Sequence, residues 1–515
     1  MRLSAALIVK NGERTLAECL ASFRHVVDDL VIVDTGSTDN TTSIAAEYGA
    51  RLFEFPWTDD FSAARQFAFD RATGEWVMWV DADDVVLHAE RIRPLIETVA
   101  ADVGMLFWPY VYARDAFGNS LAEMWRERCV RNDGSFHWAG RVHEVLASDG
   151  HWERLYSDLV AVEHHKQPDT ERGENAGHRN RDILEAQSRD ADGGRDPRIL
   201  FYLARERADT GDTRGAIRAY RDFLRVGSWE AERYMAQTGL AALYRRLRRY
   251  KTAIRADMDA LATRPEWPHA YFGLAETYYY LQEWEKVVHW ADLGRCMPAP
   301  SRLPISFPMT YRFDWIIYYT NALYRLGDLA GAEEWTRRAL EIRPDDRWHR
   351  ANIGLFGSFH PPRTWADDEI CYYASHGGPH FFPWSPAALE GGLGGAETAV
   401  IELSRAWQQS GYRVTVFGDP RERAGIYDGV VYRPWYDMRW QDHFNILILW
   451  RYPHLLDRTV TARRVFMDVH DSYGADDWSP QRLTRADRLF LKSQAHRALL
   501  PNVPDGKVAI VGNGW

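Results

Sequence analysis

The sequence has few cysteines and no long apolar runs. Its four cysteines lie far apart and form no Cys-x-x-Cys pair, which argues for a reducing compartment and against a disulfide framework or a zinc site. No window approaches the roughly 18 apolar residues that a membrane-spanning helix needs. The short apolar run near the N-terminus ends at Lys10, too early for a signal peptide with its cleavage site. We therefore expect a cytoplasmic protein without a transmembrane segment.

Positive charge is also in short supply. The formal net charge is −10 at pH 7, so no global basic field favours nucleic acid as a partner. The chain has 515 residues with an apolar fraction of 46%, which is too long for one ordinary domain and apolar enough for substantial cores. We expect about two to four domains.

Strand-like and helix-like segments alternate over residues 1–190. The strand-like runs are 4–9, 29–33 and 51–55, and the helix-like runs are 13–23, 41–48 and 61–72. This alternation predicts a Rossmann-like α/β domain, in which helices cover both faces of a parallel sheet. Ligands of such sheets lie beyond the carboxyl ends of the strands.

Acidic residues follow two of the predicted strands. The apolar run 76–80 ends on Asp81, Ala82 and Asp83, and the run 29–33 ends on Asp34. Residues i and i+2 of a strand point to the same side, so Asp81 and Asp83 are expected to face one point beyond the sheet edge. Their carboxylates would repel each other unless a cation such as Mg²⁺ or Mn²⁺ lay between them. An acidic turn after a buried strand is the plain alternative.

Four blocks occur in an ordered series: Lys10-Asn-Gly-Glu13, residues 31–40, residues 59–65 and Trp79-Val-Asp-Ala-Asp-Asp84. Together they resemble family 2 glycosyltransferases of the GT-A fold, over roughly the first 170 residues. Many relatives carry an acidic residue where Gly12 stands. The subgroup that the whole chain resembles most carries tetratricopeptide repeats after the catalytic domain, as the sublancin-type peptide S-glycosyltransferases do.

The resemblance implies a nucleotide-sugar donor, usually a UDP-sugar, and a divalent metal, Mg²⁺ or Mn²⁺. It implies that Asp83 holds the metal, and that Asp81 helps to place the metal or the ribose. Asp34 would accept from the uracil edge, Glu13 would lie near the nucleoside, and Arg65 would neutralise phosphate or fix the nucleotide loop. An ion pair on a helix surface is the plain alternative for Arg65. The other donor-binding residues implied by these blocks are Lys10, Asn11 and Thr35.

Two later segments resemble the remainder of the catalytic site. The segment from Trp138 to Glu144 resembles a G-x-x-H-E block near the acceptor, where an inverting transfer needs a base. Glu144 is the first candidate for this base and His143 the second; a polar pair on an exposed hairpin is the alternative. The resemblance also implies a metal-ligating histidine at the end of Val162-Glu-His-His165, and both His164 and His165 are candidates.

Residues 195–346 have a helical pattern, and similar helical segments recur along this region. The small or apolar residues Ala216, Ala253, Val287 and Ala332 mark corresponding positions at intervals of 37, 34 and 45 residues. A period near 34 is typical of tetratricopeptide repeats, and the long third interval contains the Pro-rich stretch 298–304. Stacked helical hairpins would form an all-α solenoid, whose concave surface could grip an acceptor or mediate homo-oligomerisation.

Residues 347–515 alternate strand and helix again. The Gly-rich segment 391–395 precedes a predicted helix at 399–409 and a strand at 411–417. The order of these elements resembles the N-terminal half of a family 4, GT-B glycosyltransferase, a second Rossmann-like half-domain. Because the chain stops at Trp515, we expect this half-domain to be incomplete and not to catalyse a reaction alone.

The sequence thus predicts a glycosyltransferase with three parts: 1–190, 195–346 and 347–515. The expected reaction is an inverting transfer from a UDP-sugar to a macromolecular acceptor, either a protein or peptide or a glycan, positioned by the repeats. Three alternatives stand beside it. They are a two-activity transferase in surface polysaccharide synthesis, an enzyme that glycosylates modified DNA, and a repeat-based scaffold with vestigial transferase folds.

Overall fold

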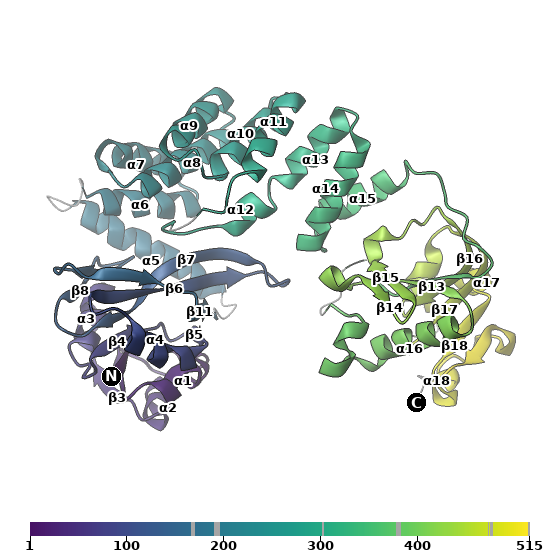
Figure 1. Cartoon of the computed structure of the whole chain (residues 1–515), viewed down its shortest axis with the longest axis horizontal. Coiled ribbons are helices and arrows are strands. Elements are labelled where there is room, and N and C mark those ends of the chain that lie inside the picture. The colour runs from purple at the N-terminus through teal and green to yellow at the C-terminus, as the bar shows by residue number, and fades with distance from the viewer. Residues whose placement is uncertain are drawn as a thin grey trace. The chain divides into compact units, whose positions relative to one another are not determined.

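The computed structural model divides into two compact units, Met1–Ala322 and Leu323–Trp515 (Figure 1). It describes residues 1–165, 170–189, 196–300, 303–376, 378, 383–471, 473 and 477–512. The predicted boundary at 190–195 between catalytic and repeat regions lies outside the described residues. Each helix among the described residues is too short or too polar to cross a membrane.

The first unit begins with a nine-stranded sheet whose order is β3-β2-β1-β4-β7-β6-β11-β5, with β10 paired to β6. Strands β3, β2, β1 and β4 run parallel, and β7 is antiparallel to both of its neighbours. The strands are β1 Leu3–Val9, β2 Asp29–Asp34, β3 Arg51–Glu54, β4 Trp76–Trp79, β5 Asp84–Leu87, β6 Val103–Arg114, β7 Ser120–Arg131, β10 Glu153–Tyr156 and β11 Ala161–His164. A separate hairpin consists of β8 Phe136–Ala139 and β9 Val145–Ser148.

Alternate residues of the parallel strands enter two different cores. Leu7 and Ile32 belong to one core cluster, with side chains of α1, and Ala6 and Val31 belong to the other, with side chains of α3. The helices of this part are α1 Leu16–Phe23, α2 Thr41–Glu47, α3 Phe61–Phe69 and α4 Ile92–Thr98. The predicted parallel α/β arrangement is therefore confirmed, and element boundaries shift by only a few residues.

This topology places the carboxyl ends of three neighbouring strands at one edge. In the parallel register Val9 of β1 pairs with Asp34 of β2, and β4 lies on the other side of β1. The segment 80–84 that follows β4 therefore emerges beside the loops that follow β1 and β2.

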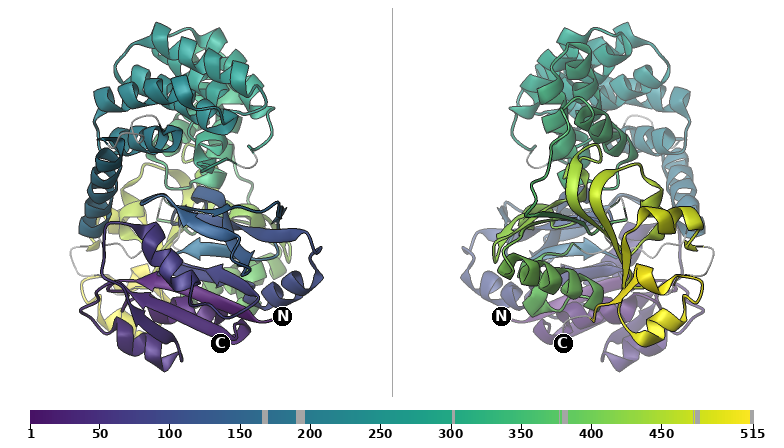
Figure 2. Two further views of the ribbon diagram at one scale, coloured as in Figure 1. Left: turned by 90° about the vertical axis from the view of Figure 1, so that its left-hand side faces the viewer. Right: turned by 90° about the vertical axis from the view of Figure 1, so that its right-hand side faces the viewer.

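Helices dominate the remainder of the first unit, and successive helices pack in pairs (Figure 2). They are α5 Thr170–Arg189, α6 Pro197–Asp209, α7 Thr213–Val226, α8 Glu230–Arg246, α9 Tyr250–Thr263, α10 His269–Tyr280, α11 Trp284–Arg295, α12 Pro308–Arg312 and α13 Ile316–Arg325. Ala216, Ala253 and Val287, which mark the sequence repeat, are each 0% exposed. The predicted helical hairpins with small contact residues are confirmed in this unit.

The second unit contains an eight-stranded sheet of order β14-β15-β13-β12-β16-β17-β18-β19, and the helices α14 and α15 precede it in the chain. The strands pair in parallel except for β14. The helices are α14 Leu329–Ile342, α15 Arg347–Gly357, α16 Gly395–Gln409, α17 Pro480–Arg485 and α18 Gln494–Ala498. The strands are β12 Glu369–Tyr373, β13 Arg413–Gly418, β14 Gly425–Tyr427, β15 Val430–Pro434, β16 His443–Trp450, β17 Thr461–Asp468, β18 Arg488–Leu491 and β19 Val508–Ile510. The second α/β sheet is thus present as predicted.

Asp29 connects the amino ends of the first sheet's strands. Its carboxylate accepts hydrogen bonds from Ser4 Oγ at 2.8 Å, Arg51 Nε at 2.8 Å and Thr73 N at 2.9 Å. Burial alone would raise the pKa of Asp29, but these hydrogen bonds outweigh it and lower the pKa to about 2. The folded state therefore binds this proton more weakly than the unfolded chain does, and the ionised carboxylate stabilises the fold above about pH 4.

We predict that Asp29→Asn lowers the free energy of unfolding of the first unit by about 2 kcal/mol at pH 7. Because the wild-type advantage is lost as pH falls towards 2, the difference narrows to about half at pH 3. Urea unfolding at both pH values measures it. An equal difference at pH 7 and pH 3 would contradict this assignment.

Candidate active site

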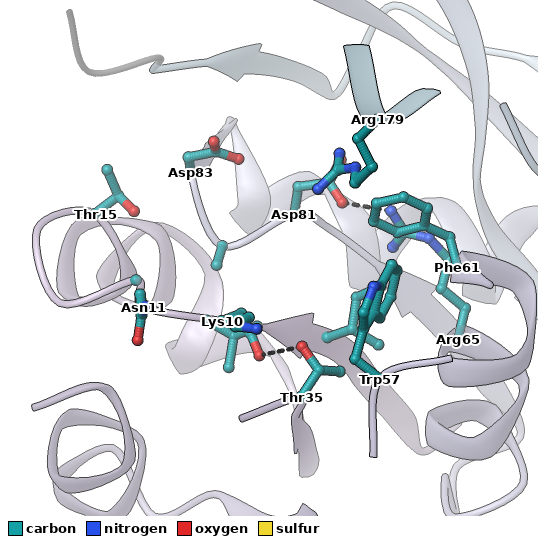
Figure 3. Close-up of a pocket in the computed structure, with 14 residues that line it drawn as sticks. Lys10, Asn11, Thr15, Thr35, Trp57, Phe61, Arg65, Asp81, Asp83 and Arg179 are labelled. Carbon is teal, nitrogen blue, oxygen red and sulfur yellow. Dashed lines mark hydrogen bonds and ion pairs between the residues drawn. The ribbon is translucent and has the colours of Figure 1, made fainter. Parts of the chain in front are cut away.

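A cavity of about 480 Å³ lies at the carboxyl ends of β1, β2 and β4 (Figure 3). Its wall is formed by the loop after β1, the residue after β2, the segment after β4, the start of α3 and one side chain from α5. The lining residues are Ile8, Val9, Lys10, Asn11, Gly12, Thr15, Thr35, Trp57, Phe61, Arg65, Asp81, Ala82, Asp83 and Arg179. This edge is where the parallel sheet was predicted to bind its ligand.

The predicted nucleotide-binding residues divide into two groups. Lys10, Asn11 and Thr35 line the cavity. Asp34 and Glu13 brace the neighbouring loop: Asp34 Oδ2 accepts from the backbone N–H of Ser37 at 3.0 Å, and Glu13 Oε1 accepts from Asn40 Nδ2 at 2.9 Å. The structure therefore brings the first group to the cavity, whereas the second group is not part of its lining.

Arg65 lies between two carboxylates. Its Nη2 lies 2.5 Å from Asp81 Oδ1, and its Nε lies 2.7 Å from Glu144 Oε1. The guanidinium also lies over the rings of Trp79 and Trp138, at 4.5 and 5.2 Å from their centroids. Burial opposes ionisation of Asp81, but the charges of Arg65 and then Arg128 hold the pKa of Asp81 well below its usual range. The expected phosphate-neutralising arginine is thus already engaged by two carboxylates.

Asp83, Asp84 and His164 form a cluster of metal-ligand type. One ligand atom from each lies within 4.8 Å of the others, and His164 Nδ1 is 3.5 Å from Asp83 Oδ1 and 3.3 Å from Asp84 Oδ1. Burial raises the pKa of Asp83 to about 6; His164 opposes this rise, and the charges of Asp81 and Asp84 reinforce it. A bound cation would remove this repulsion.

The second carboxylate of this cluster is Asp84, in the place where the sequence led us to expect Asp81. The strand alternation on which that expectation rested ends at β4, because Asp84 N donates to Asp81 O at 3.0 Å and closes a turn. The turn directs Asp81 towards Arg65 and Asp84 towards His164. Asp84 could have been considered from the sequence as a third acidic residue next to Asp83. The assumption that the strand continues through residue 83 directed attention to Asp81 instead.

The two histidine candidates point to different partners. His164 contacts Asp83 and Asp84 and stacks on Tyr112, with ring centroids 4.8 Å apart. His165 Nδ1 lies 3.2 Å from Glu18 Oε1, on α1. Only His164 therefore joins the acidic cluster.

The two candidate bases are not among the residues that line the cavity. Glu144 is buried and bound to Arg65, as described above. His143 has a left-handed backbone with φ 53°, stacks on Tyr202 at 4.2 Å, and lies 3.0 Å from Glu206 Oε1 through its Nε2. Neither candidate lines the cavity, and both meet groups of the neighbouring helices or of α3.

Several residues at this site were not singled out from the sequence. Trp57 and Phe61 form an aromatic wall, Arg128 neutralises Asp84 from below, and Arg179 and Glu206 come from helices beyond the predicted blocks. Local sequence motifs gave no signal for the residues of α5 and α6, because their proximity depends on contacts between segments far apart in the chain.

Comparison with known proteins finds a family match for the first part of the chain. Residues 4–144 match the model of the glycosyl transferase family 2. A TPR repeat-containing protein of Synechococcus elongatus is 29% identical over 279 residues, covering 52% of this chain and 69% of its own length. The glycosyltransferase LpsC of lipopolysaccharide core biosynthesis, from Rhizobium meliloti, is 29% identical over 29% of this chain and 58% of its length.

Glycosyltransferase SunS of Bacillus subtilis is 26% identical over 29% of this chain and 36% of its own length. The chain thus spans less than two thirds of either named glycosyltransferase. Among solved structures, S. aureus TarS matches 50% of this chain and 54% of its own at 16% identity, with a TM-score of 0.28 that is too low to support an argument. The match to the family model over residues 4–144 and the names of these relatives support a glycosyl transferase domain in the first part of the chain.

Arg128 and Asp84 form a fully buried ion pair beneath the site, with Nη1 and Oδ2 3.0 Å apart and both side chains 0% exposed. We predict that Arg128→Met lowers the free energy of unfolding by about 3–5 kcal/mol, because Asp84 is left buried and uncompensated. The double variant Arg128→Met/Asp84→Asn should recover part of this loss.

The control is Arg114→Met, which breaks the more exposed pair with Glu163 and should cost at most about 1 kcal/mol. Urea unfolding compares the three variants. A loss for Arg128→Met no larger than the loss for Arg114→Met would show that the buried pair contributes little.

Proposed function

We propose that the first domain transfers a sugar from a UDP-sugar, with a divalent cation and inversion at the anomeric carbon, to a macromolecular acceptor. The observation that carries this proposal is the cluster of Asp83, Asp84 and His164 beside the 480 Å³ cavity. Asp83 belongs to both features, so a cation held there would meet the diphosphate of a nucleotide that fills the cavity.

The residues present fit a divalent cation. Asp83 and His164 would hold it together with Asp84, whose carboxylate also accepts from Tyr110 at 3.0 Å. Carboxylate oxygens and an imidazole nitrogen suit Mn²⁺, and the carboxylates suit Mg²⁺. When bound, such an ion supplies Lewis-acid stabilisation of the diphosphate leaving group.

The protein's own side chains would orient the donor. We propose that Lys10, Asn11 and Thr35 contact the nucleotide along the cavity wall, and that Trp57 and Phe61 offer apolar faces to a ring of the donor. Arg65 would keep Asp81 ionised and fixed in place through the 2.5 Å ion pair. Asp34 and Glu13 would act on the same subsite indirectly, because they shape the loop after β2.

For the acceptor we propose Glu144 as the base and His143 as the alternative. As a base, Glu144 would take the acceptor's proton while its Oε1 still accepts from Arg65. The acceptor would have to reach Glu144 between α3 and the loop at 140–144. His143 is held by Glu206 and Tyr202, which ties this loop to the first repeat helix.

The repeat region is proposed to position a protein, peptide or glycan acceptor, with self-association as its other use. The contacts of α6 with His143 support the first role, because repeat residues lie beside the loop at 140–144, where we propose that the acceptor binds. A glycan acceptor has the further support that one relative is named for lipopolysaccharide core biosynthesis.

The second unit favours one alternative, a transferase with two activities. We propose that residues 347–515 are the N-terminal half of a GT-B-like domain, supported by the parallel sheet and by the glycines before α16. At the carboxyl end of β17, Asp468 is fully buried and contacts Lys492 and His470. Such a buried charged cluster at a sheet edge is common at ligand sites.

We predict that the purified protein hydrolyses or transfers from at least one UDP-sugar only when Mn²⁺ or Mg²⁺ is present. Asp83→Asn should reduce turnover by about 100-fold or more, because the cation loses a ligand at the leaving group. Asp70→Asn, an exposed residue at the end of α3, is the matched control.

Release of UDP, assayed across a panel of UDP-sugars with and without EDTA, measures both effects. Full turnover in EDTA would exclude the metal-dependent mechanism. Absence of turnover together with absence of UDP binding would favour a scaffold with vestigial transferase folds.

We predict that Glu144→Gln lowers transfer to the acceptor by about 10²–10⁴-fold, because a positioned base is lost. UDP affinity should stay within about threefold, since glutamine keeps an oxygen for Arg65. His143→Gln is the comparison, and it should retain most of the transfer. If His143→Gln is the more damaging change, the order of the two candidate bases is reversed.

A further inference from the structure

Arg179 enters the cavity from α5. It lies beyond the matched segment 4–144, yet it lines the same cavity as Asp81 and Asp83. Figure 3 shows its side chain descending from the helix towards Asp81 and the ring of Phe61. Its guanidinium carbon lies 5.0 Å from the centroid of that ring.

The charge of Arg179 is left without a carboxylate partner. Within the described residues no acidic oxygen lies within ion-pair distance of its guanidinium; its hydrogen bond is to Asn180 Oδ1 at 3.4 Å. Burial lowers the pKa of Arg179, and the more distant charges of Asp59 and Glu144 only partly oppose this effect. Arg65, in contrast, is engaged by two carboxylates. Among the described residues that line the cavity, Arg179 and Lys10 are therefore the cations without a carboxylate partner, and Arg179 is the one that offers a planar guanidinium to an anionic ligand.

The packing of α5 fixes where this side chain enters. Ile183 lies one helical turn after Arg179, on the same face, and it is buried with Val142 and Leu203. On a different side of α5, Glu185 lies 3.1 Å from Arg207 on α6. Through Ile183, the face of α5 that carries Arg179 thus packs against the loop at 140–144 and against α6.

We propose that Arg179 binds the diphosphate of the nucleotide-sugar donor, so that α5 completes the donor site. This inference rests on the proposed function. The planar guanidinium can donate two parallel hydrogen bonds to phosphate oxygens, which lysine cannot reproduce. The ring of Phe61 covers one face of the group and leaves its donor edges for the ligand.

The test measures the affinity of the full-length protein for UDP, UMP and uridine by calorimetry in the presence of Mn²⁺. Arg179→Ala should weaken UDP binding by about 10- to 100-fold, because charge-assisted hydrogen bonds are lost. The loss for UMP should be smaller, and uridine should bind as before. The UDP affinity of Arg179→Lys should lie between the affinities of the wild type and of Arg179→Ala.

Arg181→Ala is the control from the same helix. Its side chain pairs with Asp182, and it should leave all three affinities unchanged. Thermal unfolding of each variant checks that α5 stays folded.

Two outcomes would overturn the assignment while the proposed function stands. UDP affinity within twofold of wild type in Arg179→Ala would show that Arg179 does not contact phosphate. An equal loss for uridine and UDP would show that Arg179 acts only by shaping the aromatic wall. If the wild-type protein binds none of the three ligands, the proposed function itself fails, and this inference fails with it.

Discussion

Charge compensation at the end of β4 is the constraint on which the site depends. Three carboxylates occur within four residues, and each has a different partner. Arg65 pairs with Asp81 and holds its pKa well below the usual range, and Arg128 forms a fully buried ion pair with Asp84. Among the described residues, the basic group beside Asp83 is His164. Asp83 is left in a repulsive environment that raises its pKa to about 6, burial being the larger cause. A cation bound beside Asp83 would offset the repulsion between these carboxylates.

The same buried charges connect the cavity wall to the loop at 140–144. Arg65 contacts Asp81 in the cavity wall and Glu144 in the loop that leads to the helical region. His143, next to Glu144, contacts Glu206 on α6, and Arg198 donates to its carbonyl oxygen. Helix α6 therefore contacts the loop at 140–144 directly. A change in α6 would be transmitted to Arg65 through only a few contacts.

Sequence reasoning succeeded where the signal was local. Strand ends could be located from apolar runs, so Asp34, Asp81 and Asp83 were correctly assigned to one sheet edge. The argument from strand alternation does not extend beyond β4, because the hydrogen bond from Asp84 N to Asp81 O replaces the strand with a turn. Which of these carboxylates binds a cation stays a prediction. The choice between His164 and His165 needed the pairing of β11 with β5, which places His164 opposite Asp84. Arg179 and Glu206 had no local signal, because their approach depends on how two helices pack.

The most direct test of this account is the position of a bound cation. Crystals grown with Mn²⁺ and UDP would be measured near the manganese absorption edge. The account predicts one anomalous peak within coordination distance of Asp83 and His164, with diphosphate oxygens completing the shell. A nucleotide in the cavity with no metal at these residues, or a manganese peak at a different cluster, would contradict it.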